Sequence, residues 1–477
     1  MAKEVKTDKK TEKKHEKKRR HKRNPAWAKL DNTALIFPVI ASRDMTSVYR
    51  ISATLTENID GDLLQEAQDM VLSQFLAFRM RLKMGFFWYY FEENDRKPPK
   101  VHKENSYPGS YINKSNNNHY MFRVTYYKRR INLEVFHALT DGYGGLLFLK
   151  ELIYQYLRLA HRDEFAGEKD RLSPGLSLDQ EDSYVKSFKK PKSHDEAYRS
   201  QKALILKGER LPKGETGVIH GYLPLDQLKA AAKSHNVTIN QYLVGCFVYS
   251  VYCEYLHKRI PKRPINCCVP VDLRPYYNSA TLKNFFAIVT AVFHPEKDDY
   301  SFDEVLGIVA ESLKKQITPE NLDTILSYNV SNEQNIFLRP VPIFIKNLAI
   351  RAVYEATSDG ATATVTNIGN QQLREPYGKY VEHFYAMLAM SRGQNLKGAI
   401  VSYNGTLVIT FTSILEDRSI QKKFFRLIAG DGVEVAVETN DIDDEEEDDT
   451  VSEDDSSSET KITDKDTETE DEDEQMS

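Results

Sequence analysis

The sequence predicts an α/β protein made of two α+β halves, with a charged linker between them and a charged tail at each end. Over residues 25–165, aromatic and β-branched runs alternate with amphipathic helical patterns, and the same strand-then-helix order begins again within residues 215–440. Residues 166–214 are charged, contain Pro and Ser and have weak periodicity, which is typical of a long crossover.

The two ends of the chain differ in composition from the middle. Residues 1–24 hold 12 Lys or Arg and four acids, a net charge of +8, whereas residues 441–477 hold 20 Asp or Glu and two Lys, a net charge of −18. Because the whole chain carries −5, residues 25–440 carry +5. Both ends lack the apolar residues needed to offset the entropy of ordering, so we expect a disordered basic arm and a disordered acidic tail. Weak contact of the arm with nucleic acid, an anionic membrane or the acidic tail stays open, as does a solubilising role without any partner.

The first half begins with a strand pattern, SVYRISATL, and continues with an amphipathic helix pattern from residue 60. Asp62 and Gln65 have the spacing of a helix N-cap and its reciprocal partner. Strands are then predicted in GFFWYYFEE, HYMFRVTYY and INLEVFH, before a helix from Gly145 to about Ala160.

The second half repeats this order. A strand in GVIHGYLPL precedes a helix in DQLKAAAKSHN, and a buried helix follows that opens with a Thr238–Gln241 capping box. The remaining predictions are an apolar passage around Val341–Tyr354, a helix at 302–316, and strands in PINCCVPVDLR, NFFAIVTAVFH, ATATVTNIG, KGAIVSYNG and TLVITFTSI.

Cysteine usage and hydropathy bear on the compartment. The four cysteines form no C-x-x-C pair and no zinc spacing, so we predict no metal site and expect a reducing environment. The N-terminus has charge where a secretory signal requires an apolar region. Since no stretch reaches the roughly 18 apolar residues of a membrane span, we expect a cytoplasmic protein without a transmembrane segment.

The segment INLEVFHALTDG places His137 four residues before Asp141, where a strand pattern meets a helix pattern. The spacing alone is weak, because a chain with 12 histidines contains on the order of one such pair by chance, and His294–Asp298 is a second copy in a charged loop. The first copy has a more informative context: His137 extends the inward row of a strand, and Asp141 can cap the next helix. This arrangement suits a proton-transfer residue that meets a substrate at the start of a helix. A half-buried core histidine beside an Asp-Gly turn is the other interpretation, and spacing and context alone leave both open.

HALTDG also matches the H-x-x-x-D-G motif, and the sequence resembles the chloramphenicol acetyltransferase-like acyltransferases. This superfamily includes condensation domains, plant acyl-CoA-dependent acyltransferases, wax ester synthases and alcohol acetyltransferases, and the last branch is the most similar. Four further segments resemble the superfamily in order over residues 26–430: FLAFRMRL, VTINQYLVGCFVYSV, VPVDLRPYYNSATLKNFFAIV and TVTNIG. Three departures are Lys283 in place of a Gly, a single rather than a double histidine, and the absence of the plant-type D-F-G-W-G sequence.

The resemblance implies two chloramphenicol acetyltransferase-like subdomains around a central channel. It also implies a free-standing acyltransferase that moves an acyl group from acyl-CoA, or another acyl thioester, to an alcohol or amine. His137 would be the general base, acyl-CoA would be a co-substrate, and no cofactor would be bound permanently. A non-catalytic member of the same fold that binds a ligand or a protein partner is the alternative.

The resemblance assigns the other site residues as well. It gives Asp141 and Gly142 a structural role, in which Asp141 pairs with a distant arginine; Arg79 is the first choice for this arginine and Arg274 the second. Oxyanion or substrate contacts are expected from three polar side chains of the second half, Thr366, Asn367 and Asn284.

Overall fold

The computed structural model describes residues 27–31, 33–167, 201–334 and 340–440. The predicted basic arm and acidic tail lie outside the described residues, and so does most of the predicted linker. No helix within the described ranges is long and apolar enough to cross a membrane.

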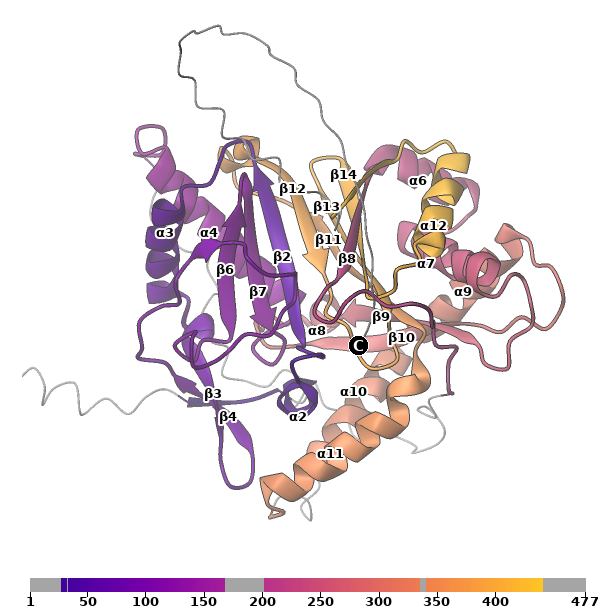
Figure 1. Cartoon of the computed structure of the whole chain (residues 1–477), viewed down its shortest axis with the longest axis horizontal. Coiled ribbons are helices and arrows are strands. Elements are labelled where there is room, and N and C mark those ends of the chain that lie inside the picture. Colours follow the sequence, from indigo (N-terminus) through magenta and orange to yellow (C-terminus); the bar gives the residue numbers. More distant parts are fainter. Residues whose placement is uncertain (1–26, 32, 168–200, 335–339, 441–477) are drawn as a thin grey trace, which may run out of the picture. The chain divides into compact units, whose positions relative to one another are not determined.

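Three sheets organise the described chain (Figure 1). The first has five strands in the order β12-β2-β7-β6-β5, and all of its pairs are antiparallel except β5–β6. The strands are β2 (Val48–Leu55), β5 (His102–Lys103), β6 (Phe122–Tyr127), β7 (Arg130–Phe136) and β12 (Val381–Met387). A separate three-stranded sheet has the order β1-β4-β3, with β1 (Trp27–Lys29), β3 (Met80–Met84) and β4 (Tyr89–Glu93).

The third sheet has seven strands in the order β10-β9-β11-β13-β14-β8-β15. Only β11 pairs in parallel, with β9 on one side and β13 on the other. The strands are β8 (Gly217–Pro224), β9 (Ile265–Asp272), β10 (Phe286–Phe293), β11 (Ala363–Gln371), β13 (Leu396–Tyr403), β14 (Thr406–Ser413) and β15 (Ala436–Thr439).

Each large sheet has its own hydrophobic core. Helices α3 (Gly61–Gln74) and α4 (Gly142–Ala160) pack together over the five-stranded sheet, as Figure 1 shows. Helices α6 (Leu225–Ser234), α7 (Ile239–Ser250), α9 (Phe302–Gln316) and α12 (Ser419–Gly430) cover one face of the seven-stranded sheet. These two cores correspond to the two α+β halves that the sequence predicts.

Strand β12 crosses between the halves. It belongs by sequence to the predicted second half, residues 215–440, yet it pairs with β2 and forms an edge of the five-stranded sheet, with Phe384 opposite Ala53. It also lies against β13 and β14, and its Tyr385 ring packs on His220 of β8 with 4.6 Å between ring centroids. One strand therefore joins the two sheets, so the first sheet is not made from the first half alone.

Local predictions differ in outcome. The helix at 302–316 and the Thr238–Gln241 capping box are confirmed. The predicted cap at Asp62 is wrong, because Asp60 accepts hydrogen bonds from the backbone N–H groups of Asp62 and Leu63. The helix ends at Gln74, since a 3-10 turn and then β3 take up the remaining residues.

Several further elements complete the chain. The predicted apolar passage is helix α11 (Ile343–Thr357), which follows α10 (Pro319–Gln334). Helix α2 (Phe37–Ile40) follows β1, α8 (Arg274–Tyr277) follows β9, and a π-helical turn, Val251–Tyr255, follows α7. The short 3-10 helices are Thr33–Leu35, Leu76–Arg79, Ser358–Gly360 and Tyr377–Tyr380.

Candidate active site

His137 directly follows β7, and three elements fix its position. Its backbone N–H donates to the carbonyl of Ser47 at 2.8 Å. Its ring stacks on Phe37 of α2 with 4.5 Å between centroids, and it meets the Tyr49 ring in an edge-to-face arrangement with 5.1 Å between centroids. The residue is neither fully buried nor fully exposed, so its ring is held by aromatic neighbours without being sealed into a core.

A chain of hydrogen bonds defines which ring nitrogen of His137 carries the proton. The carboxylate of Asp31, which is buried, accepts from Asn284 Nδ2 at 3.1 Å and from the Asn284 backbone N–H at 3.2 Å. Because a carboxylate only accepts here, this contact orients the amide and leaves Asn284 Oδ1 facing His137 Nδ1 at 2.9 Å. Nδ1 therefore donates, and Nε2 keeps the free lone pair that a base requires.

The surroundings also favour the neutral ring. Burial is the largest influence on the pKa of His137 and lowers it; the charge of Lys397 acts in the same direction. Asp141, the residue's own backbone carbonyl and Asn284 raise the pKa, and the net result lies below the ordinary value of 6.5. The imidazole is consequently uncharged at neutral pH.

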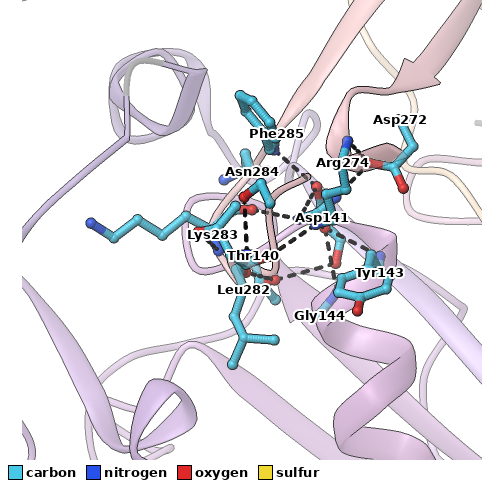
Figure 2. A network of polar contacts seen from close by, with 12 residues as sticks. Thr140, Asp141, Tyr143, Gly144, Asp272, Arg274, Leu282, Lys283, Asn284 and Phe285 are labelled. Atoms are coloured by element: carbon cyan, nitrogen blue, oxygen red, sulfur yellow. Dashed lines mark hydrogen bonds and ion pairs between the residues drawn. The ribbon is translucent and has the colours of Figure 1, made fainter. Parts of the chain in front are cut away.

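Asp141 is the centre of a second polar cluster (Figure 2). As the N-cap of α4, its side chain accepts from the backbone N–H groups of Tyr143 and Gly144. Its two oxygens also accept from Arg274 at 3.1 and 2.9 Å, and Oδ2 accepts from the Phe285 N–H at 3.0 Å. The carboxylate is thus satisfied by groups from both halves of the chain. Within the described residues it makes no hydrogen bond to the His137 ring.

Arg274, not Arg79, is the arginine that pairs with Asp141. Its guanidinium is buried, donates to the carbonyls of Thr281 and Lys283, and contacts Asp272 at 2.9 Å. Arg79 instead lies 3.5 Å from Glu93 in the three-stranded sheet. The first choice made from the sequence is therefore wrong and the second is right, because a segment of the opposite half, not the residues after α3, approaches the start of α4.

Glycine allows this close approach. A Cβ at Gly144 would lie 2.0 Å from Thr140 Oγ1 and 2.9 Å from the Leu282 carbonyl oxygen, so no other residue fits without a shift of backbone. A Cβ at Gly142 would meet only the Ile368 side chain, at 3.6 Å. From the sequence, the open backbone at Gly144 could have served a ligand. In the structure, the segment of the second half around Leu282 occupies this space.

The three oxyanion candidates, Asn284, Asn367 and Thr366, have different surroundings in the structure. Asn284 is committed to His137 and Asp31, as described above. Asn367 is exposed, and its Oδ1 accepts from the Gly369 N–H at 2.8 Å. Thr366 lies on β11 two residues after Thr364 and before the irregularity between Asn367 and Asn370, so side-chain alternation gives Thr364 and Thr366 the same face. Thr366 stays an oxyanion candidate on this sheet face.

A buried lysine that the sequence did not single out lies on this same face. The strand register places five residues side by side across the seven-stranded sheet: Thr290, Cys268, Thr364, Lys397 and Thr412. Directly opposed residues share a face of the sheet, so all five lie on the same face. Lys397 is buried, and its Nζ donates to the Ala389 carbonyl and the Ser391 hydroxyl. Burial lowers the pKa of Lys397 to about 8, so it brings a positive charge near His137 at neutral pH.

The described residues hold two other features that bear on the site. No group of three or more His, Cys, Asp or Glu side chains in this part of the chain is arranged to hold a metal ion. A hollow of about 930 Å³ lies between β12, β8 and the β6–β7 turn, with Arg130, Tyr222 and His383 among its lining residues. Since Arg130 begins β7 and His137 follows its end, the hollow lies on the order of 20 Å from the imidazole.

Replacement of Asp141 by Ala is expected to destabilise the fold by about 3–5 kcal/mol, because it leaves the buried guanidinium of Arg274 without its main partner. Asp272→Ala is the matched control: it removes the other carboxylate of Arg274, but that side chain is 45% exposed and its loss should cost less than about 1 kcal/mol. Urea unfolding of the two variants measures the difference. Equal stability of the two variants would contradict the assignment of Asp141 as the structural partner.

Comparison with known proteins gives different results for sequence and structure. No protein-family model matches the chain, and no characterised protein sequence matches it. The likeness is therefore one of structure.

Three solved structures illustrate it. Trichothecene 15-O-acetyltransferase from Fusarium sporotrichioides is 12% identical, with 86% of this chain and 94% of that chain covered and a TM-score of 0.56. F. sporotrichioides TRI101, complexed with coenzyme A and T-2, is 10% identical over 83% of this chain and 97% of that chain, with a TM-score of 0.56. The first condensation domain of the CDA synthetase is 12% identical over 85% and 96%, with a TM-score of 0.55. The chain therefore has the fold of the chloramphenicol acetyltransferase-like acyltransferases and condensation domains, as its sequence predicts.

Proposed function

We propose that this protein transfers an acyl group from an acyl thioester, in particular acyl-CoA, to an alcohol or amine, and that His137 is the general base. The observation that carries the proposal is the hydrogen-bond chain from Asp31 through Asn284 to His137 Nδ1. It leaves a neutral ring with its Nε2 lone pair available, in a residue that is only partly buried.

The proposed reaction needs one proton acceptor and no covalent enzyme intermediate. As the acceptor oxygen or nitrogen attacks the thioester carbonyl, its proton moves to His137 Nε2. The tetrahedral intermediate then expels the thiolate by cleavage of the carbon–sulfur bond. The imidazolium returns its proton to the departing sulfur, which restores the neutral ring for the next cycle.

Negative charge on the carbonyl oxygen requires a donor as the intermediate forms. We assign this part to the Thr366 hydroxyl, which lies on the same sheet face as Lys397. The Lys397 ammonium group adds a positive field in a buried setting, where charge is weakly screened, and it also keeps the imidazole neutral before the reaction.

The nature of the substrates rests on the structural neighbours. One of them is a trichothecene 15-O-acetyltransferase, and another was solved in complex with coenzyme A and T-2. These descriptions support acyl-CoA as the donor and an alcohol as the acceptor. Four free cysteines fit the reduced environment of the cytoplasm, which we propose as the location.

His137→Ala tests the proposal directly. Loss of the general base is expected to lower turnover by about 10²–10⁴-fold while the fold stays intact. The measurement is thiol release from acetyl-CoA and longer acyl-CoAs in the presence of a panel of alcohols and amines. If the wild type releases no more thiol than His137→Ala with every acceptor, the fold is used for binding and the proposal fails.

Asn284→Ala tests the orientation of the imidazole. Without its Oδ1 acceptor, Nδ1 no longer has a fixed partner in Asn284, and we expect kcat to fall by about 10–100-fold with a smaller change in KM. Thr281→Ala in the same loop is the matched control, since its hydroxyl accepts from the Lys283 N–H and does not contact His137 within the described residues. If Asn284→Ala and Thr281→Ala have the same kcat, Asn284 does not position the imidazole of His137.

Lys397→Met tests the electrostatic part of the site through the pH profile. The wild type should lose activity as pH falls through a His137 pKa below 6.5, because protonation removes the base. Removing the nearby positive charge makes the imidazolium less unfavourable, so the pKa rises and the acidic limb of kcat/KM moves to higher pH. A limb at the same pH in both proteins, or one displaced to lower pH, would contradict the assignment.

A further inference from the structure

The most exposed large hydrophobic side chains of the described residues gather on three elements. The six with the highest exposure are all on β1, the β3–β4 hairpin and α11, and Leu348 at 72% and Phe86 at 68% lead them. We call this group the hairpin–helix surface: Trp27, Met84, Phe86, Phe344, Leu348 and Val353. Trp88, at 52%, extends it along the hairpin. A cluster of this kind indicates an interaction site more strongly than the scattered exposed residues of an ordinary surface.

Direct contacts join the hairpin to the helix. The backbone N–H of Ile343 donates to the Phe86 carbonyl at 2.9 Å, and Lys346 Nζ donates to the Phe87 carbonyl at 2.9 Å. Asn347 Nδ2 donates to the Tyr89 hydroxyl at 2.8 Å. The hairpin and α11 therefore form one continuous surface, and Figure 1 shows them side by side.

Helix α11 presents a wide apolar face. The exposed positions of α11 between residues 344 and 353 cover about half of the helix circumference at 100° per residue. All of them except Arg351 are apolar: Phe344, Ile345, Leu348, Ala349, Ala352 and Val353. The exposed Glu355, one turn further along, is paired with Arg392. Neither of the two hydrophobic cores includes these apolar positions, so packing within the described chain does not account for this face.

The elements of this surface carry a net positive charge. Residues 27–29 of β1, 80–93 of the hairpin and 343–357 of α11 contain five Lys or Arg and three Glu, a net charge of +2. The segment that directly precedes β1, residues 1–24, adds a net charge of +8 to the chain next to Trp27. The elements that expose apolar side chains are thus also the ones best suited to an anionic partner.

We propose that the hairpin–helix surface docks on an anionic lipid bilayer. Aromatic and aliphatic side chains enter the boundary between headgroups and acyl chains, tryptophan is favoured at that depth, and lysine and arginine meet the acidic headgroups. A second copy of the chain fits less well, because a twofold contact places the same surface, with its net positive charge, on both sides.

The surface is also close to the site. Arg351 donates to the Val39 carbonyl of α2 at 3.1 Å, and Phe37 at the start of α2 stacks on His137. One short helix thus connects the docking face to the imidazole. If the proposed function holds, a lipid-soluble substrate would reach His137 from the bilayer side; the docking itself does not depend on the reaction.

Vesicle flotation of the full chain tests the docking. We expect the protein to float with phosphatidylcholine vesicles that contain about one-third phosphatidylglycerol, and much less with phosphatidylcholine alone. The triple variant Phe86→Ser, Phe344→Ser, Leu348→Ser should bind at least about tenfold more weakly, since it removes three exposed apolar side chains. The matched control is Ile260→Ser, Val437→Ser, which changes two half-exposed apolar residues on other elements and should bind like the wild type.

The chain supplies its own probe of depth, because Trp27 lies on β1 and Trp88 lies in the turn between β3 and β4, and these are its two tryptophans. Their fluorescence should shift to the blue on binding and be quenched by brominated acyl chains. Failure of the wild type to float, equal flotation of the triple variant, or unquenched tryptophans would overturn the proposal. Conversion of a wild-type dimer to a monomer by the triple variant, without any change in flotation, would assign the surface to self-association instead.

Discussion

The ion pair between Asp141 and Arg274 is the interaction on which the candidate site depends. Asp141 caps α4 in the first half, and Arg274 begins α8 in the second, so a single pair of charges ties the motif segment to the opposite half. Both groups are buried, and their remaining hydrogen-bonding capacity is used by backbone groups and, for Arg274, also by Asp272; this is the condition under which a buried pair is tolerated. Gly144 allows the two segments to approach closely enough for this pair to form.

The same approach of the two halves brings Asn284 to His137. Asn284 follows Lys283, whose carbonyl accepts from Arg274, and precedes Phe285, whose N–H donates to Asp141. The Asp141 pair therefore fixes the backbone on both sides of the residue that orients the imidazole. In this arrangement Asp141 acts on the chemistry through geometry, while Asp31 and Asn284 determine the tautomer.

The sequence predicted the fold class, most strands and helices, and the motif, because these depend on local periodicity and on short segments such as HALTDG. It did not predict which arginine meets Asp141, since the choice between Arg79 and Arg274 depends on how the halves pack. Asp31 and Lys397 escaped notice for a related reason. Asp31 lies in a short connection without a pattern, and Lys397 stands at the start of a strand, where a lysine is ordinarily solvent-exposed; only the register across the sheet shows that it is buried.

Strand β12 has a consequence for the order of synthesis. Until residues 381–387 have left the ribosome, β2 lacks its outer neighbour, and a row of unpaired backbone groups stays open along an apolar sheet. The amino-terminal lobe is thus unable to complete itself during translation, and its closure waits on a segment more than 300 residues downstream of β2. Completion of the five-stranded sheet accordingly depends on a non-local pairing, which is slower to form than pairing between neighbouring strands.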